Sequence, residues 1–324
     1  MHRLPEKRQS QLIVRWPMGD AVQRLRHEGI TGVATLTDLI AELDPPRVVW
    51  LMVPAALTQA VVVELESLLS ADDIVVDGGN SYYRDDIARA ERLAGNGIHY
   101  LDVGTSGGVH GFDRGFCLMI GGDAEAVAVL DPIFLALAAG PESVTRTPGR
   151  AGAFAQAEYG YVHCGAAGAG HFVKMVHNGV EYGQMAVLAE GMAILRNADI
   201  GAVERSANAE TAPLADAEFY RYDFDIASIL ETWRRGSVIS SWLLDLTATA
   251  VTRSPELGEY SGHVADSGEG RWTVRAAIDE GVPAHVLAAA LWERFDSRGG
   301  AEYANKALSA MRSEFGSHNE SAAR

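Results

Sequence analysis

The chain has 324 residues, which fits two domains or one large one, and 48% of its residues are hydrophobic, enough for a sizeable core. Its formal net charge of −16 argues against nucleic acid and anionic membranes as general partners, so an anionic substrate would need a local cluster of cations. The two cysteines, Cys117 and Cys164, have no metal-ligand spacing to other Cys or His residues, which predicts no metal site and fits a reducing, cytoplasmic setting.

Short apolar runs alternate with helical patterns up to about residue 150, after a charged start (1–10) that does not resemble a secretory signal. The apolar segment 48–69 is interrupted by Pro54 and by polar residues, so we do not interpret it as transmembrane. We predict strands at 47–54, 73–79, 98–104 and 116–122. Mostly apolar strands separated by helices are typical of parallel βαβ units, so the pattern predicts an α/β domain with a Rossmann-like parallel sheet.

The second half of the chain is predicted to be helical. Residues 141–160 are rich in Pro, Gly and Ala and indicate a connecting loop. Helical patterns follow at 215–235, 237–253, 271–279, 284–297 and 300–315. We therefore predict an α/β domain over 1–160 and an all-α domain over 161–324.

Small residues gather where the predicted strands end. In parallel sheets, ligands bind beyond the carboxyl ends of strands. Those ends are MVPA (52–55), DGGNS (77–81) and DVGTSGG (102–108), and their glycines and small polar side chains suit a ligand that approaches the backbone closely.

The stretch FVKMVHNGVEYG (172–183) places polar residues at helical spacing in an apolar run. At 100° per residue, Lys174, His177, Asn178 and Glu181 fall in one stripe about 100° wide, and the rest of the helix is predicted to be buried. The stripe is either a satisfied hydrogen-bond network or one wall of an active site. Lys174 and Glu181, about 10 Å apart along the axis, could hold a small molecule between a base and an acid.

Several strings together resemble one enzyme family. HCGAAGAGHFVKMVHNGVEYGQM, with DGGNSYYRDD, DVGTSGG, WRRGSV, SGEGRWT and RSEFGSH, is similar to the decarboxylating 6-phosphogluconate dehydrogenases, chiefly to their short-chain form, over roughly residues 20–318. The resemblance implies that the 1–160 domain binds the dinucleotide and that the 161–324 domain binds substrate and dimerises. It also implies a homodimer that uses NAD or NADP and serves the pentose phosphate pathway. It implies oxidation of 6-phosphogluconate at C3 and loss of CO₂, which gives ribulose 5-phosphate.

The resemblance also implies roles for the polar stripe. Lys174 would be the general base for the C3 hydroxyl, which requires burial or a neighbouring charge to lower its pKa. Glu181 would be the acid that protonates C1 of the enediol. His177 and Asn178 would hold the substrate hydroxyls and carboxylate. The carboxylate would lie in the loop formed by Ser106, Gly107 and Gly108, although these residues alone could be an ordinary tight turn.

Further residues follow from the same resemblance. Tyr182 matches a phosphate-binding tyrosine, although it could simply pack in the core, and Arg312 and His318 match a phosphate-binding pair from the tail of the other subunit. That tail could otherwise be a frayed terminus. Two cations of the family are replaced by Ser240 and Ser267, so phosphate binding would depend more on the remaining cations, or the substrate would carry less charge. The nicotinamide would contact Met52, Val53, Pro54, Ala55 and Asn80, the last of which also contacts substrate and is, by itself, a common turn residue.

The amino terminus departs from the family pattern. The family begins with a strand, a G-x-G-x-x-G loop and a helix, and no such motif occurs near the start of this sequence. Residues 12–16 align with the second strand, which places the ribose-reading position near Trp16 or Pro17. We therefore expect the sheet to lack its first βα unit and the cofactor to keep mainly its nicotinamide-side contacts. NAD and NADP cannot be distinguished by this altered segment.

Two other functions compete with this interpretation. One is a 3-hydroxyacid dehydrogenase of the hydroxyisobutyrate type, against which the HNGVEY and RSEFGSH strings argue. The other is a catalytically silent homologue that binds a sugar phosphate or only dimerises, which the absent glycine-rich loop favours.

Overall fold

The computed structural model describes residues 13–15, 31–202 and 214–316. Contacts between residues divide the chain into two compact units, Met1–His177 and Asn178–Arg324. The division falls inside the longest described helix, α9 (Ala169–Arg196), so the two ends of this helix belong to different units.

A five-stranded sheet with the order β3-β4-β5-β6-β7 forms the centre of the first unit. Its strands are β3 (Val48–Leu51), β4 (Ile74–Asp77), β5 (His99–Ser106), β6 (Cys117–Gly122) and β7 (Tyr161–Gly165). The four strands predicted between residues 47 and 122 are confirmed, and β3, β4 and β5 are parallel as expected.

The sheet is mainly parallel, as the predicted Rossmann-like α/β domain requires, but the parallel expectation is wrong at one pair of strands, because β6 runs antiparallel to β5. Only residues 107–116 connect the two, with the short helices η1 (Gly108–His110) and α6 (Gly111–Arg114). A parallel connection needs a crossover of about a dozen residues or more, so this connection returns the chain directly alongside β5. The sequence pattern also missed β7, which lies parallel to β6 directly after the predicted loop.

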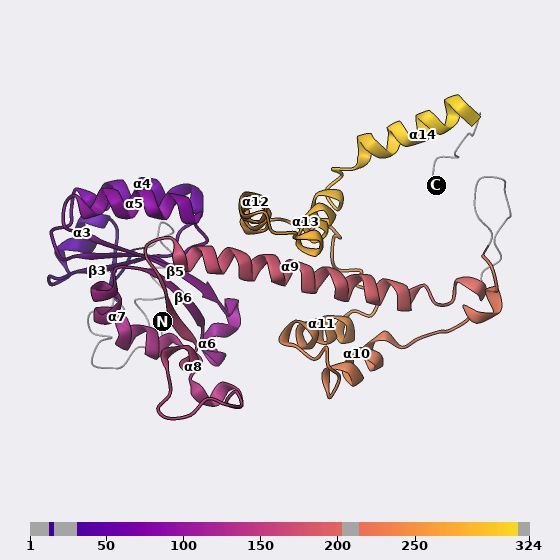
Figure 1. Cartoon of the computed structure of the whole chain (residues 1–324), viewed down its shortest axis with the longest axis horizontal. Coiled ribbons are helices and arrows are strands. Elements are labelled where there is room, and N and C mark those ends of the chain that lie inside the picture. The colour runs from indigo at the N-terminus through magenta and orange to yellow at the C-terminus, as the bar shows by residue number, and fades with distance from the viewer. Residues whose placement is uncertain (1–12, 16–30, 203–213, 317–324) are drawn as a thin grey trace. The chain divides into compact units, whose positions relative to one another are not determined.

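Helices cover both faces of this sheet (Figure 1). Leucine, isoleucine and valine side chains of α3 (Leu36–Ala41), α4 (Ala55–Glu66) and α5 (Tyr83–Ala94) form a core with one face. Side chains of α7 (Ala124–Leu137) form a second core with the other face. The sheet is thus buried on both sides, which explains why its strands are nearly continuous apolar runs.

Two further strands form a separate parallel pair, β1 (Ile13–Arg15) with β2 (Thr31–Val33). The predicted strand at 12–16 corresponds to β1. Within the described ranges β3 pairs with β4 alone, so no strand joins the two sheets there.

The second unit is helical. Its helices are the remainder of α9, α10 (Ile226–Arg234), α11 (Trp242–Arg253), α12 (Glu269–Glu280), α13 (His285–Asp296) and α14 (Glu302–Gly316). The remaining short elements of the chain are η2 (Pro141–Ser143), α8 (Gln156–Tyr159), η3 (Ile200–Ala202) and η4 (Ala217–Phe219).

Two predicted helices begin later than expected. The pattern over 215–235 yields α10 only from residue 226, because the Asp225 side chain accepts the Ser228 backbone N–H and caps the helix there. The pattern over 237–253 yields α11 only from residue 242, because Ser241 caps it in the same way through the Leu244 N–H.

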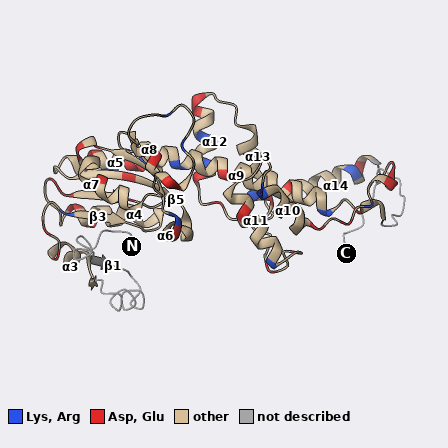
Figure 2. Ribbon diagram, turned by 90° about the horizontal axis from the view of Figure 1, so that it is seen from below, with Lys and Arg blue, Asp and Glu red and all other residues tan. Residues whose placement is uncertain are grey.

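Acidic residues are distributed over both units (Figure 2), in keeping with the net charge of −16. Among the described helices, none combines the length and apolar character needed to cross a bilayer.

Candidate active site

The Lys174 side chain is 6% exposed and packs on the end of β5. A Cβ atom built on Gly104 of β5 would lie 2.4 Å from the Lys174 Cβ, which is too short for two non-bonded carbon atoms. Glycine at 104 therefore lets α9 approach the strand closely enough for Lys174 to lie at the strand end. The sequence pattern predicts a polar stripe that includes Lys174 on a buried helix, and the observed burial of Lys174 agrees with that prediction.

Asp102 of β5 fixes the start of α9. Its carboxylate accepts the backbone N–H groups of Gly168, at 2.6 Å, and of His171, at 2.8 Å. Burial raises the pKa of Asp102, and the His171 charge and these N–H groups act in the opposite direction. A carboxylate at the first turn of a helix satisfies otherwise unpaired donors, so β5 holds this end of α9 in place.

The structure brings two of the predicted substrate residues together. The Ser106 Oγ lies 3.3 Å from Nε2 of His177, which is one turn after Lys174 on α9. Gly107 and Gly108 follow with φ angles of 134° and 52°, which side chains rarely adopt. The glycines therefore allow a tight loop whose backbone is open to a ligand.

The other predicted residues of the first unit lie at the neighbouring strand ends. Residues 52–55 connect β3 to α4, and the Met52 side chain is 56% exposed. Asn80 is exposed in the loop between β4 and α5. These positions fit a nicotinamide ring at the carboxyl ends of the strands. The 324 residues contain no G-x-G-x-x-G string, the usual motif for binding a dinucleotide pyrophosphate.

In the second unit, Tyr182 packs against an arginine that sequence reasoning missed. The Arg294 guanidinium on α13 lies 3.4 Å from the centroid of the Tyr182 ring. The Tyr182 hydroxyl accepts the backbone N–H of Ser267 at 3.3 Å and lies 3.4 Å from its Oγ. A stacked guanidinium beside two hydroxyls is well suited to bind a phosphate. The resemblance implies that Ser267 replaces a cation of the family. Ser267 and the cationic side chain of Arg294 both contact Tyr182.

Asn178 contacts a second residue without a predicted role. Its Nδ2 donates to Oε1 of Glu269 at 2.9 Å, and both side chains are buried. The other oxygen, Oε2, has no hydrogen-bond partner among the described residues. Glu269 lies in the SGEGRWT string, which is part of the resemblance. The sequence does not single it out, because a carboxylate at the start of a helix looks like an ordinary first-turn residue.

Two more arginines lie close by, but a carboxylate already pairs with both. Asp266 accepts from Arg271 at 2.7 Å and from Arg298 at 2.7 Å. The hydrogen bond from Arg271, with help from Arg298 and against the effect of burial, lowers the pKa of Asp266 to about 2. These charges are largely neutralised, whereas the hydrogen bonds described for Arg294 go to the Ala265 carbonyl and the Met185 sulfur.

The remaining predicted residues lie on α9 and at the carboxyl terminus. Glu181 is half-buried on α9, two turns after Lys174. Arg312 lies on α14, and His318 lies outside the described residues.

The expectation that the rest of the 172–183 helix is buried is wrong. Val173, Val176 and Val180 are between 36% and 46% exposed. Lys174 faces inward because Gly104 and Asp102 hold that side of the start of α9 against the sheet, which leaves Val173 and Val176 on the opposite side.

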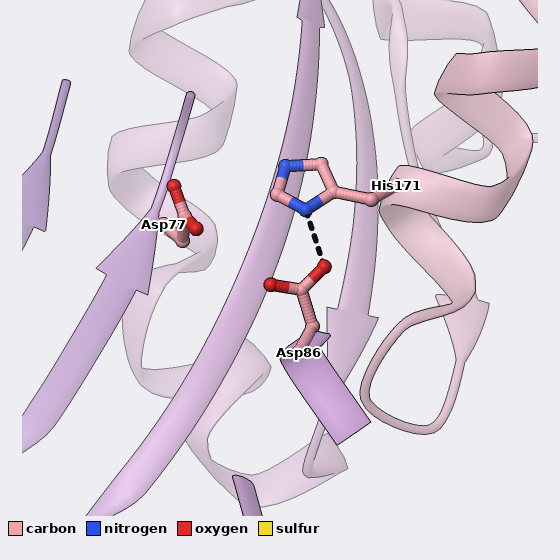
Figure 3. Close-up of side chains that lie close together, drawn as sticks. All are labelled: Asp77, Asp86 and His171. Carbon is pink, nitrogen blue, oxygen red and sulfur yellow. Dashed lines mark hydrogen bonds and ion pairs between the residues drawn. The ribbon is translucent and has the colours of Figure 1, made fainter. Parts of the chain in front are cut away.

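A buried cluster of Asp77, Asp86 and His171 has donor atoms within 4.8 Å of one another, as a metal site would (Figure 3). However, the guanidinium of Arg89 forms ion pairs with Asp86 at 3.1 Å and with Asp77 at 3.5 Å. The positive charge that these carboxylates need is therefore supplied by a side chain, and the cluster is better described as a hydrogen-bond network.

Comparisons with known proteins show the family of the chain. The model of the NAD binding domain of 6-phosphogluconate dehydrogenase matches residues 3–149, and the model of the C-terminal domain of 6-phosphogluconate dehydrogenase matches residues 170–208. The Bacillus subtilis protein YqeC, assigned to the 6-phosphogluconate dehydrogenases, is 37% identical over 92% of this chain and 87% of its own length. The chain belongs to the 6-phosphogluconate dehydrogenase family.

A second relative supports the same family. The NAD(+)-dependent, decarboxylating 6-phosphogluconate dehydrogenase of Haloferax volcanii is 36% identical over 92% of this chain and 87% of its own length. The solved 6-phosphogluconate dehydrogenase of Plasmodium falciparum has the same fold, with a TM-score of 0.67 and 24% identity over 93% of this chain and 58% of that one. Relatives in the 6-phosphogluconate dehydrogenase family are named as NAD(+)- or NADP(+)-dependent.

Proposed function

We propose that this chain catalyses the oxidative decarboxylation of 6-phosphogluconate to ribulose 5-phosphate, as a cytoplasmic NAD- or NADP-dependent enzyme of the pentose phosphate pathway. One observation supports the proposal most directly. Lys174 is buried on α9, and His177, one turn further along α9, contacts Ser106 at the end of β5. In this proposal Lys174 is the base, and the adjacent glycine loop holds the substrate carboxylate.

The residues have distinct roles in this proposal. Lys174 takes the proton of the C3 hydroxyl as the general base. A bound nicotinamide would accept the hydride from C3. Ser106, His177 and the backbone of Gly107 and Gly108 hold the carboxylate, which leaves as CO₂ once C3 is a ketone.

The last step is the protonation of the enediol. Glu181 gives its proton to C1 and so completes ribulose 5-phosphate. Glu181 follows Lys174 by two turns along the sequence of α9.

We propose that Arg294, Tyr182 and Ser267 bind the phosphate, with Arg312 and His318 of a second subunit. The support is the stacked guanidinium, which the described hydrogen bonds leave without a carboxylate partner. If so, Arg294→Met should raise the Kd of 6-phosphogluconate by about 10- to 100-fold, the effect of losing one charge-assisted contact. The Kd of gluconate, which has no phosphate, should change little.

Isothermal titration calorimetry with both ligands tests this assignment and needs no cofactor. Arg271→Met is the matched control, because that arginine pairs with Asp266. An Arg294→Met protein that binds 6-phosphogluconate as the unaltered chain does would refute the phosphate site. Formation of ribulose 5-phosphate, measured with reduction of NAD or NADP, tests the reaction. Phosphate binding without any turnover would instead favour the silent homologue.

We also propose that the chain is a homodimer. Val173, Val180, Val187 and Ile194 recur every seven residues along α9 and are between 41% and 73% exposed. A seven-residue repeat of β-branched residues is the pattern that pairs helices, and water-exposed apolar stripes of this length are unfavourable in a monomer. α14 likewise exposes apolar side chains, including Tyr303 and Phe315, which favours exchange of this tail between subunits.

Val187→Glu should therefore convert the dimer to a monomer, because it places a charge in the middle of the stripe. Val282→Glu is a matched control, since both valines are 54% exposed and Val282 lies outside α9. Sedimentation velocity distinguishes the two species. The dimer proposal fails if the unaltered chain is monomeric. It also fails if both variants sediment as the same species as the unaltered chain.

A further inference from the structure

Five buried side chains connect the Asn80 loop to the start of α9 in the first unit. They are Asp77, Asp86, Arg89, Tyr100 and His171, here called the Asp77–His171 network, and each is at most 3% exposed. None of them has a role in the proposed reaction. Buried polar groups of this number are costly unless each is paired, so their arrangement needs a reason.

One end of the network holds the loop that carries Asn80. The two oxygens of Asp77 accept from the backbone N–H of Gly79 at 3.0 Å and from the Ser81 Oγ at 2.6 Å. These two residues flank Asn80 in sequence. The position of Asn80 is therefore set by a carboxylate at the end of β4.

The other end holds the first turn of α9. The Nδ1 of His171 lies 2.7 Å from the Asp86 Oδ2 (Figure 3). The Asp86 carboxylate only accepts, so Nδ1 donates. Burial by itself would lower the pKa of His171, but the hydrogen bond to Asp86 and the charges of Asp86, Asp77 and Asp102 outweigh it and raise that pKa. Lys174 lies three residues further along the same helix.

The middle of the network joins the two carboxylates. The Tyr100 hydroxyl lies 2.8 Å from Oδ1 of Asp86 and 3.1 Å from Oδ2 of Asp77. Arg89 forms ion pairs with both carboxylates and donates to the Gln59 side chain at 3.1 Å. Without these two donors the carboxylates would repel each other, so Tyr100 and Arg89 keep the two ends at a fixed separation.

We propose that the Asp77–His171 network positions Lys174 relative to Asn80, so that Asp86, Tyr100 and His171 are positioning residues for the proton transfer from the C3 hydroxyl. The chemical role rests on the proposed function, but the positional claim can be tested without turnover. Because a displacement of about 1 Å can cost a rate factor of about 100, a stiff buried network between two site residues has a direct effect on catalysis.

The composition of the chain makes a direct measurement possible. It contains only three lysines, Lys7, Lys174 and Lys306. Protein grown with ¹³Cε-labelled lysine gives three resolvable NMR signals, and Lys174→Met identifies the signal of Lys174 by its loss. The chemical shift and the titration midpoint of that signal report the surroundings of the Lys174 amine.

Two matched variants separate positioning from stability. Tyr100→Phe removes the hydroxyl that joins the carboxylates, and Tyr161→Phe removes a comparable hydroxyl, which donates to Asp131 at 3.0 Å from β7. Both tyrosines are buried, so both variants should lower the Tm. Only Tyr100→Phe should shift or broaden the Lys174 signal and move its titration midpoint.

A second pair of variants tests the proposal even if Tyr100→Phe does not fold. His171→Asn keeps an N–H donor close to the Nδ1 position, whereas His171→Leu removes it with a similar volume. We expect the Lys174 signal near its original shift in the first variant and displaced in the second. Equal Lys174 signals within each pair of folded variants would overturn the proposal and leave the network a purely structural element.

A turnover measurement completes the test where the reaction is detectable. His171→Leu should lower kcat by about 10- to 100-fold and change KM less, since the network does not touch substrate. Absence of turnover in the unaltered chain would count against the proposed function alone, because the NMR result does not depend on it.

Discussion

The 324-residue chain is expected to bind NAD and NADP at least about 100-fold more weakly than the same chain with a grafted strand–GxGxxG–helix segment ahead of residue 12. Three backbone N–H groups that contact a pyrophosphate contribute about 3 kcal/mol together, which corresponds to this factor in Kd. The sequence contains no such loop, and within the described residues β1–β2 and β3–β7 form two unconnected sheets. The graft should also raise turnover.

Fluorescence titration with NADH and NADPH measures this difference, and the phosphogluconate Kd serves as an internal standard. A graft in which all three glycines are alanines is the matched control, because it keeps the length and the strand. Micromolar binding of either dinucleotide by the ungrafted chain would disprove the prediction and require another backbone segment to bind the phosphates.

The second large effect concerns the two proposed catalytic residues. In the grafted chain, Lys174→Met should lower kcat by a factor of about 100 to 10,000, the usual contribution of a positioned base. Lys174 is 6% exposed, so bulk water has little access to replace the amine as a base. The Kd of 6-phosphogluconate should change far less than kcat.

Glu181→Gln should impair only the protonation of the enediol. Deuterium incorporation at C1 of ribulose 5-phosphate in D₂O measures this step, and reduction of the nicotinamide measures the earlier one. Gln184→Met, at an exposed position of the same helix, is the control. Near-normal kcat in both the Lys174 and the Glu181 variants would remove these residues from the mechanism.

Much of the polar stripe on α9 could be predicted from sequence, because helical spacing is local. Lys174, Asn178 and Glu181 align at 100° per residue whatever surrounds them. Which side of the helix is buried could not be predicted in the same way. It depends on Gly104 and Asp102, which lie about seventy residues earlier in the chain and make a close contact that no periodicity reveals.

The missed residues have the same origin. Asp86 lies in an amphipathic helix and looks like a solvent-exposed acid, yet it is 0% exposed and pairs with His171, 85 residues away in the sequence. Arg294 lies in a helix with other charged residues, and only the packing of α13 on Tyr182 distinguishes it. β6 runs antiparallel to β5 because the connection between them is short. A pattern of apolar strands does not include the length of that connection.

The glycines between α9 and the sheet have a consequence for how this chain can change over time. A Cβ on Gly170 would lie 2.4 Å from the Met119 carbonyl oxygen, and one on Gly121 would lie 2.7 Å from the Gly170 nitrogen. In a library of all single substitutions, Gly104, Gly121 and Gly170 would therefore be depleted when cells are sorted for protein abundance. Lys174 substitutions would be depleted only when cells are selected for growth that requires the reaction. The positions that most restrict sequence drift near this site are thus ones that carry no functional group.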